Sequence, residues 1–171
     1  MRKLLKNKQG LTLIEVIVGS LLFGLVAITV FTVIAPMMQA FMISNDLAEY
    51  NMVLDSVGNK ITSEIAQASE VTPVANGVVV TTDAGDTYYY VDGNGVLRRT
   101  SGNIPGDNDE FVFQPGFYRG KSAVFEVIGD ADSPLYTVNV TVSSTGGRAA
   151  SSATRERAYT VRSLLIMSNN Q

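Results

Sequence analysis

The sequence of 171 residues contains no cysteine and no histidine. Without cysteine there is no thiol nucleophile and no thiolate zinc site, and without histidine there is no imidazole base and no Ser-His-Asp triad. We therefore expect no enzymatic activity and no cofactor. The length is that of a single domain able to bury its own core. With 46% hydrophobic and 17% charged residues, the composition is that of a folded protein.

Charge is also absent from a long stretch near the N-terminus. Residues 16–45 carry no charged side chain, and residues 11–38 consist mainly of Leu, Ile, Val, Phe and Ala. At ~1.5 Å per helical residue, segment 11–38 is long enough to cross ~30 Å of hydrocarbon. The sequence therefore predicts a transmembrane helix.

The basic residues before this segment predict its orientation. Residues 1–10 contain four basic side chains and no acid, whereas the remaining residues carry nine basic and sixteen acidic ones, a net charge of −7. The positive-inside rule places residues 1–10 in the cytoplasm and the bulk of the chain outside. Two alternatives fit less well: a secretory signal peptide has a shorter apolar core, and a buried helix of a soluble domain carries a polar stripe.

One carboxylate, Glu15, lies inside the apolar segment. An ionised carboxylate in a bilayer costs at least about 2–3 kcal/mol unless a cation pairs with it. The next basic residue along the chain is Lys60. A helix N-terminus also tolerates an acid, so a helix-dipole role is the alternative. The α-amino group created by a cut after Gly10 is the cation that the sequence otherwise lacks.

The segment Lys8-Gln9-Gly10 followed by Leu11-Thr12-Leu13-Ile14-Glu15-Val16 resembles the class III leader and cleavage motif of type IV pilins and type II secretion pseudopilins. In that family a prepilin peptidase cuts after the glycine, and the new amine is N-methylated. The resemblance implies that Gly10 precedes the cut, that Leu11 is the methylated terminus, and that Glu15 is the acid the family keeps at the fifth mature position. In a bundle of such helices a carboxylate must be neutralised, and the Leu11 amine of a neighbouring subunit would pair with Glu15. Leu11 stands where phenylalanine is usual.

The resemblance also implies partners and a location. The partners are other pilin or pseudopilin subunits, the prepilin peptidase, and indirectly a motor ATPase with its membrane platform. The subunit would wait in the cytoplasmic membrane, as a single-pass protein with its C-terminal domain outside, and then enter an extracellular pilus or pseudopilus. Apolar helices leave a membrane only for another apolar environment, which a bundle of such helices supplies. The rival hypothesis is an uncleaved membrane anchor that carries an extracellular binding module.

Beyond the apolar segment the pattern becomes one-sided. Apolar residues recur at spacings of three and four, which predicts an amphipathic helix with one buried stripe. The stripe consists of Leu47, Tyr50, Leu54, Val57, Ile61, Ile65 and Ala68. We predict one helix over residues 11–70, kinked or unwound near Thr32 by Pro36 and ended by Thr72-Pro73. A coiled-coil dimer could use the same stripe, but it lasts only about three heptads.

The rest of the sequence, residues 73–171, predicts an antiparallel β-sheet. Runs of β-branched and aromatic residues alternate with Gly, Pro, Asn and Asp. These runs are residues 78–82, 87–91, 96–100, 110–113, 123–128, 136–143 and 157–166. The clearest hairpin has Asp92-Gly93-Asn94-Gly95 as its turn. The expected fold is α+β, with the sheet lying on the helix stripe.

A Tyr-rich strand, the DGNG turn and a Leu-Arg-Arg strand after a long helix resemble minor pilins and J-type minor pseudopilins. The absence of the disulfide loop common in major pilins also favours a minor subunit. We predict a leader at 1–10, a transmembrane and assembly helix at 11–38, its amphipathic continuation at 39–72, and an extracytoplasmic β-rich domain at 73–171.

Other groups of polar residues that could form functional sites have structural explanations. Asp107, Asp109 and Glu110, or Asp130 with Asp132, could ligate calcium, but neither group has EF-hand spacing, so we expect solvated turns. DNA contact by the basic residues is disfavoured by the net acidic chain. Those residues are Arg98, Arg99, Arg119, Lys121, Arg148, Arg155, Arg157 and Arg162. Lys121 and Ser122 do not predict a catalytic pair, because adjacent strand residues face opposite sides.

Overall fold

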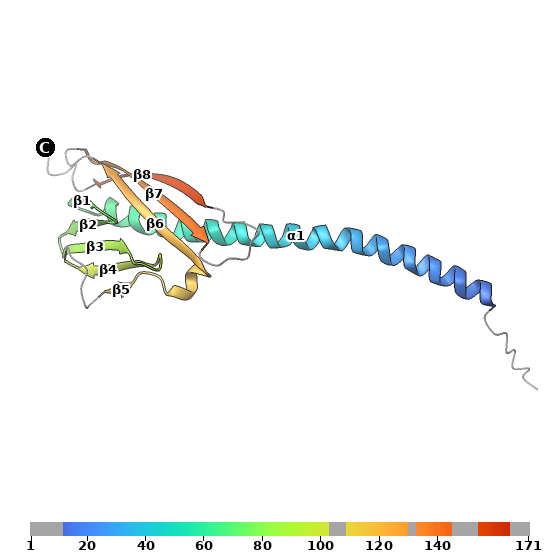
Figure 1. Cartoon of the computed structure of the whole chain (residues 1–171). Coiled ribbons are helices and arrows are strands. Elements are labelled where there is room, and N and C mark those ends of the chain that lie inside the picture. The colour runs from blue at the N-terminus through green and yellow to red at the C-terminus, as the bar shows by residue number, and fades with distance from the viewer. Residues whose placement is uncertain (1–11, 103–108, 130–132, 145–153, 165–171) are drawn as a thin grey trace, which may run out of the picture. The chain divides into compact units, whose positions relative to one another are not determined.

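A computed structural model describes residues 12–102, 109–129, 133–144 and 154–164. A long helix, α1 (Leu13–Ala66), is followed in these residues by antiparallel strands and one short 3-10 helix (Figure 1). The predicted α+β fold, a long apolar helix with antiparallel strands packed on it, is confirmed. The chain divides into two compact units, Met1–Asp46 and Leu47–Gln171, and each is described by itself.

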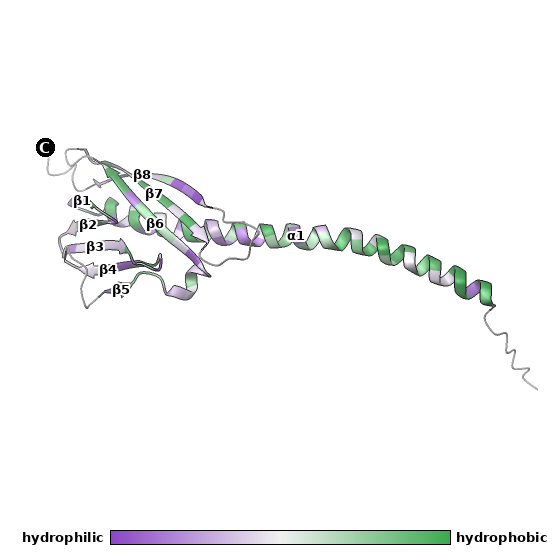
Figure 2. Ribbon diagram, viewed as in Figure 1, coloured by the Kyte–Doolittle hydropathy of each residue, from purple (hydrophilic) through white to green (hydrophobic). Residues whose placement is uncertain are grey.

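The described part of the first unit is the apolar beginning of α1. Its large hydrophobic side chains are exposed around the helix, including Phe23, Phe31 and Phe41 at 73–76% exposure. Figure 2 shows that hydrophobic residues predominate along this part of α1. Among the described residues, α1 alone has the length and composition to cross a membrane, and none of its most apolar window is buried. Apolar side chains exposed on all sides of a helix require a lipid or protein environment.

Pro36 does not interrupt the helix. We predicted a kink or unwinding near Thr32, but α1 runs through Pro36 without a break in its secondary structure. The lost N–H is one of many backbone donors in a helix of 54 residues, so the turns on either side hold the geometry. The predicted unwinding is wrong for this structure.

In the second unit the helix ends earlier than predicted. It stops at Ala66, not Glu70, and strand β1 (Glu70–Val74) follows at once. The amide of Ser69 donates to Thr81 O at 2.8 Å, so sheet pairing competes successfully for the next residues. Strand β1 was not predicted from the sequence, because Thr72-Pro73 also fits the end of a helix. Proline is tolerated in β1 because this strand lies at the sheet edge.

The strands form two sheets instead of the single sheet we predicted. The first is antiparallel in the order β1-β2-β3-β4-β5. Its remaining strands are β2 (Gly77–Thr82), β3 (Gly85–Val91), β4 (Leu97–Ser101) and β5 (Glu110–Phe111). The short helix η1 (Pro115–Tyr118) then leads to the second sheet, in the order β6-β7-β8. Its strands are β6 (Lys121–Gly129), β7 (Leu135–Ser144) and β8 (Arg155–Arg162).

The core lies between residues 50–65 of α1 and the inner faces of both sheets. The helix contributes the predicted stripe from Tyr50 to Ile65, each residue at most 2% exposed, whereas Leu47 is 37% exposed. Val78, Val80 and Tyr89 cover the stripe from the first sheet, and the second sheet does so with the side chains of Val138, Val140 and Val142. Because the chain's own sheets bury this stripe, it is not available for the alternative coiled-coil dimer.

An ion cluster with one buried member, Lys121, attaches the helix to the start of β6. Glu49 accepts hydrogen bonds from Lys121 Nζ at 2.7 Å and from Arg119 Nη1 at 2.9 Å. The Lys121 side chain is only 5% exposed, and its ammonium lies 4.9 Å from the centre of the Tyr50 ring. Glu49 lies 70 residues before Arg119 and 72 before Lys121, so the cluster joins segments that local patterns treat separately.

Replacing Lys121 by methionine should lower the free energy of unfolding by about 1–3 kcal/mol, because Glu49 then loses its buried partner. Thermal unfolding of the full chain in detergent micelles measures the loss. The matched control is Arg119→Met, which removes the more exposed partner and should cost less. Equal losses in the two variants would contradict the view that burial of Lys121 makes its pair the stronger contact.

A second attachment joins the helix to β8. Asp55 accepts hydrogen bonds from Arg157 and from the Tyr159 hydroxyl, the latter at 2.9 Å. The Tyr159 ring lies so close to Gly58 that an added Cβ at that position would be 2.2 Å from the ring. The glycine therefore allows the ring to lie directly against the helix backbone. Burial, followed by the neighbouring Asp55 carboxylate, raises the pKa of Tyr159.

Candidate processing and assembly site

The candidate site comprises the predicted cut and the acid that follows it. Gly10 and Leu11, the predicted cleavage and methylation residues, lie outside the described residues. Thr12 is the first described residue, and α1 begins at Leu13. The third predicted residue, Glu15, is therefore in the first turn of the helix.

Glu15 closes a capping box with Thr12. One carboxylate oxygen, Oε2, accepts hydrogen bonds from the Thr12 amide and from the Thr12 hydroxyl, both at 2.9 Å. In return the Glu15 amide lies 3.4 Å from the Thr12 hydroxyl oxygen, a long contact. Such reciprocal bonds satisfy donors that a helix start otherwise leaves unpaired. Thr12 and Glu15 together therefore define where α1 begins.

The second carboxylate oxygen is differently placed. No described residue donates a hydrogen bond to Oε1 of Glu15, while Oε2 takes both bonds from Thr12. The carboxylate can thus remain in the capping box and still accept a bond from a cation. The helix-dipole role of Glu15 and its role in charge pairing are therefore geometrically compatible.

Thr12 is a residue of the candidate site that we did not predict from the sequence. The signal was present as Thr-x-x-Glu directly before an apolar run, which is the pattern of a capping box. We predicted a charge in lipid or a helix-dipole residue at Glu15, but no local partner for its side chain. The hydrogen bonds show that the nearest partner is three residues away in the same chain.

The other polar side chains of the apolar helix bond to its own backbone. The hydroxyls of Ser20, Thr29 and Thr32 donate to carbonyl oxygens three or four residues earlier, at 2.8–2.9 Å. Such bonds remove the cost of placing a hydroxyl in an apolar environment. Glu15 is the one ionisable residue in the described part of the apolar segment before Asp46, so it is the residue that needs a charged partner.

The acidic residues considered for calcium have other partners or lie outside the described residues. Asp109 accepts a hydrogen bond from Tyr90, and Glu110 pairs with Arg99 at 2.6 Å. Burial and the bond to Asp109 raise the pKa of Tyr90 to about 12. The described residues contain no group of three acidic side chains placed to hold a metal ion. The remaining candidates, Asp107, Asp130 and Asp132, are outside the described residues.

Several of the basic residues considered for DNA contact are occupied within the chain. Arg98 pairs with Asp92, Arg99 with Glu110, Arg119 and Lys121 with Glu49, and Arg157 with Asp55. Arg155 and Arg162 lie at the two ends of β8, and Arg148 lies outside the described residues. Five of these eight cations are therefore paired with carboxylates of the same chain.

Lys121 and Ser122 point to opposite sides of β6. Lys121 is buried and donates to Glu49, whereas the Ser122 hydroxyl lies 2.9 Å from the hydroxyl of Ser143. The ammonium therefore does not reach the neighbouring hydroxyl to act as its base. This arrangement follows from the alternation of side chains along a strand.

The comparisons with known proteins bear on the N-terminal segment. A family model described as the prokaryotic N-terminal methylation motif matches residues 5–35. Comparisons of the chain with curated proteins and with solved structures found no match. The matched residues include Gly10, Leu11 and Glu15 and most of the apolar segment. Together, the motif and the apolar helix indicate a precursor of the pilin or pseudopilin type, anchored in a membrane.

Proposed function

We propose that the chain is a structural subunit of a type IV pilus or type II secretion pseudopilus. Prepilin peptidase cuts the precursor after Gly10, and Leu11 becomes the N-methylated terminus. The unit Leu47–Gln171 lies outside the cytoplasmic membrane. The work of the subunit is assembly through its apolar helix, without catalytic turnover. The observation that carries this proposal is one carboxylate, Glu15, inside the matched methylation motif and in an apolar segment, residues 11–45, that has no other charged side chain.

The apolar surface of the helix allows subunits to move from the membrane into a bundle of helices. Phe23, Phe31 and Phe41 are largely exposed, as are the aliphatic residues around them. Such a surface exchanges lipid for the helices of neighbouring subunits at little net hydrophobic cost, so packing and polar contacts decide the outcome. Subunits drawn from the membrane by a motor ATPase and its platform would then pack helix against helix.

Glu15 would determine the register of that packing. Its Oε2 is held by Thr12, and its Oε1 is directed to no described donor. The methylated amine of Leu11 in a neighbouring subunit supplies both the positive charge and a hydrogen-bond donor. In an apolar bundle an unpaired carboxylate or amine is costly. Only those helix registers in which the two groups pair are therefore stable.

We assign the chain to the minor, initiating or tip subunits. The second unit carries eight strands in the described residues and is not cross-linked, since the sequence has no cysteine. A minor subunit occurs in few copies, so its exposed surface is not required to pack against identical heads along the filament.

Intact-mass measurement of the protein purified from membranes tests the processing. We expect loss of residues 1–10 and a gain of one methyl group on Leu11. A Gly10→Leu variant should keep all 171 residues, because a bulky side chain blocks the cut. Purification of the wild-type chain at full length would contradict the proposal and support the uncleaved membrane anchor. A different new N-terminus would show that the cut lies elsewhere.

A further inference from the structure

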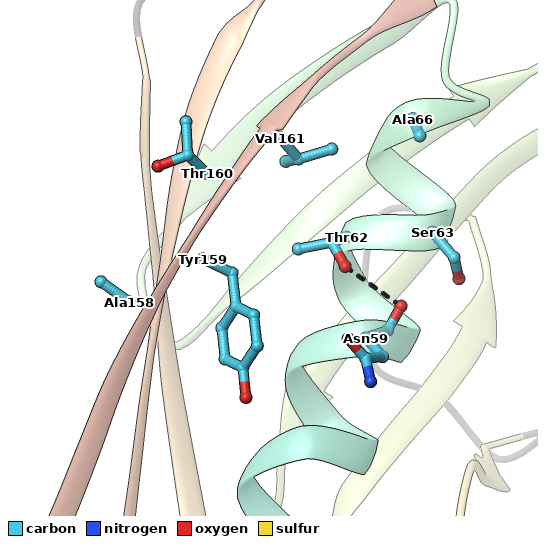
Figure 3. Close-up of a pocket in the computed structure, with 8 residues that line it drawn as sticks. All are labelled: Asn59, Thr62, Ser63, Ala66, Ala158, Tyr159, Thr160 and Val161. Carbon is cyan, nitrogen blue, oxygen red and sulfur yellow. Dashed lines mark hydrogen bonds between the residues drawn. The ribbon is translucent and has the colours of Figure 1, made fainter.

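One hollow of the second unit, of about 620 Å³, lies between α1 and β8 (Figure 3). Its hydroxyl groups already have partners within the chain. Those of Thr62 and Ser63 donate to carbonyl oxygens of α1, and that of Tyr159 donates to Asp55. A hollow whose polar side chains are occupied in this way has few hydrogen bonds left for a polar ligand.

A smaller hollow, of about 300 Å³, differs in this respect. Its described walls come from strands β3, β4 and β5, and every one of their side chains is polar. The walls of this pocket, the β3–β5 pocket, are Thr87, Arg99, Thr100, Ser101 and Glu110. Within the described residues, the hydroxyls of Thr87 and Ser101 take part in no hydrogen bond. Both hydroxyls are therefore available to a ligand.

The register of the strands arranges four of these side chains on one face of the sheet. Thr87 lies beside Ser101 in the register of β3 and β4, and Arg99 is paired with Glu110 across β4 and β5. Steps between neighbouring strands are about 5 Å, and the step from Ser101 to Arg99 along β4 is about 7 Å. These spacings are comparable with those between hydroxyl groups across one sugar ring.

Arg99 is held in position inside the pocket. It donates to Glu110 Oε2 through Nε at 3.0 Å and through Nη2 at 2.6 Å. The Tyr89 hydroxyl also lies within hydrogen-bonding reach of the Arg99 side chain. Both bonds from Arg99 go to one carboxylate oxygen, and no described residue donates to the other, Oε1. Glu110 therefore retains an acceptor for a ligand.

The two charges of the β3–β5 pocket favour an uncharged ligand. An anion would lie next to the Glu110 carboxylate, and a cation would lie next to the Arg99 guanidinium, so each would meet a like charge. A neutral ligand rich in hydroxyl groups meets no such repulsion. It donates to the carboxylate and accepts from the guanidinium, and hydrogen bonds to charged groups are stronger than those between neutral groups.

We propose that the β3–β5 pocket binds one neutral sugar residue of a glycan. Thr87 and Ser101 hydrogen-bond to hydroxyl groups of the ring, and Glu110 Oε1 accepts from a further one. Since the pocket has room for little more than one residue, we expect a dissociation constant of about 1–10 mM for a monosaccharide. This inference goes beyond assembly through the apolar helix and does not depend on cleavage after Gly10.

Saturation-transfer NMR with the methyl glycosides of glucose, galactose, mannose and N-acetylglucosamine tests the proposal. The full chain is held in micelles of lauryldimethylamine oxide, because a detergent with a sugar headgroup would compete. We expect saturable binding of at least one glycoside. Thr87→Val should weaken it about threefold to tenfold, since one hydrogen bond is lost. The matched control is Thr137→Val on β7 of the other sheet, which should bind as the wild type does.

Glu110→Ala provides an independent measurement. It removes the free carboxylate oxygen and should weaken glycoside binding at least about tenfold. The ion pair that it breaks is exposed, so the fold should hold, and thermal unfolding verifies this for every variant. Absence of saturable binding for all four glycosides, insensitivity to both pocket variants, or an equal loss in Thr137→Val would overturn the proposal. Inorganic phosphate that displaces a bound glycoside from the wild type would also overturn it, by making the pocket an anion site.

Discussion

Replacing Glu15 by leucine should leave the protein in the membrane and reduce its incorporation into filaments at least about tenfold. The substitution removes an ionisable group from an apolar helix, so membrane insertion becomes more favourable. It also removes the only acid in the described apolar segment able to pair with a neighbouring amine. A tenfold loss corresponds to about 1.4 kcal/mol, less than the value of many charge pairs in apolar surroundings. Quantifying the subunit in sheared filaments and in membranes measures both effects.

Thr12→Val separates the two roles of Glu15. The variant keeps the carboxylate and removes the hydroxyl that donates to it at 2.9 Å. Loss of a helix cap typically costs about 0.5–2 kcal/mol, confined to the first turn of the helix. We expect this variant to assemble far better than Glu15→Leu. If Thr12→Val reduced incorporation as strongly as Glu15→Leu, capping would explain the defect; unchanged incorporation of Glu15→Leu would contradict charge pairing altogether.

Replacing Gly95 by alanine should destabilise the second unit by about 2–4 kcal/mol. Gly95 has φ of +75°, where residues with a Cβ pay a steric cost of about 1–2 kcal/mol. An added Cβ would also lie 2.1 Å from the Ser122 Cβ and 2.6 Å from its Cα. Because Cα is backbone, β6 itself would have to move, which adds an overpacking cost. Thermal unfolding of the full chain in micelles measures the change.

Gly93→Ala is the matched control in the same turn. An added Cβ at Gly93 meets no atom within 4 Å, and its φ is not positive. Since Asp92 holds the turn through its bonds to the amides of Asn94 and Val96, a side chain at position 93 leaves that network intact. We expect a change within about 0.5 kcal/mol. A comparable loss in the two variants would show that the contact with β6 is not what makes Gly95 necessary.

The acid dependence of this turn follows from the same network. Burial alone would raise the pKa of Asp92, but hydrogen bonds from Arg98 and from two backbone amides hold that pKa below its ordinary value. A lowered carboxyl pKa means that the stabilisation is present above the unfolded value and is lost as pH falls through the folded one. The turn that presents Gly95 to β6 is therefore stabilised at neutral pH.

Periodicity and turn chemistry predicted most strands correctly. The predicted strands from Val78 onward all appear, with bounds that differ by a few residues, because alternating β-branched residues between turn residues are a local signal. Strand β1 was not predicted, because a proline at position 73 fits the end of a helix and an edge strand equally well. Only the pairing of Ser69 and its successors with β2 distinguishes the two.

The candidate site was predictable in its residues but not in its geometry. Gly10, Leu11 and Glu15 follow from a basic leader, a glycine and one acid in an apolar run, all within fifteen residues. The Thr-x-x-Glu pattern also indicates the capping role of Thr12, but only the hydrogen bonds to Glu15 Oε2 establish it.

The sequence by itself determined the apolar helix, its charged leader, the isolated Glu15 and the alternation of strands and turns. Each of these features depends on residues that are close to one another in the sequence. The tertiary structure alone decided that the strands divide into two sheets, that Gly95 must touch Ser122, and that Glu49 holds Lys121. Those features join segments tens of residues apart, and a contact across that separation depends on how whole elements pack, which no local pattern encodes.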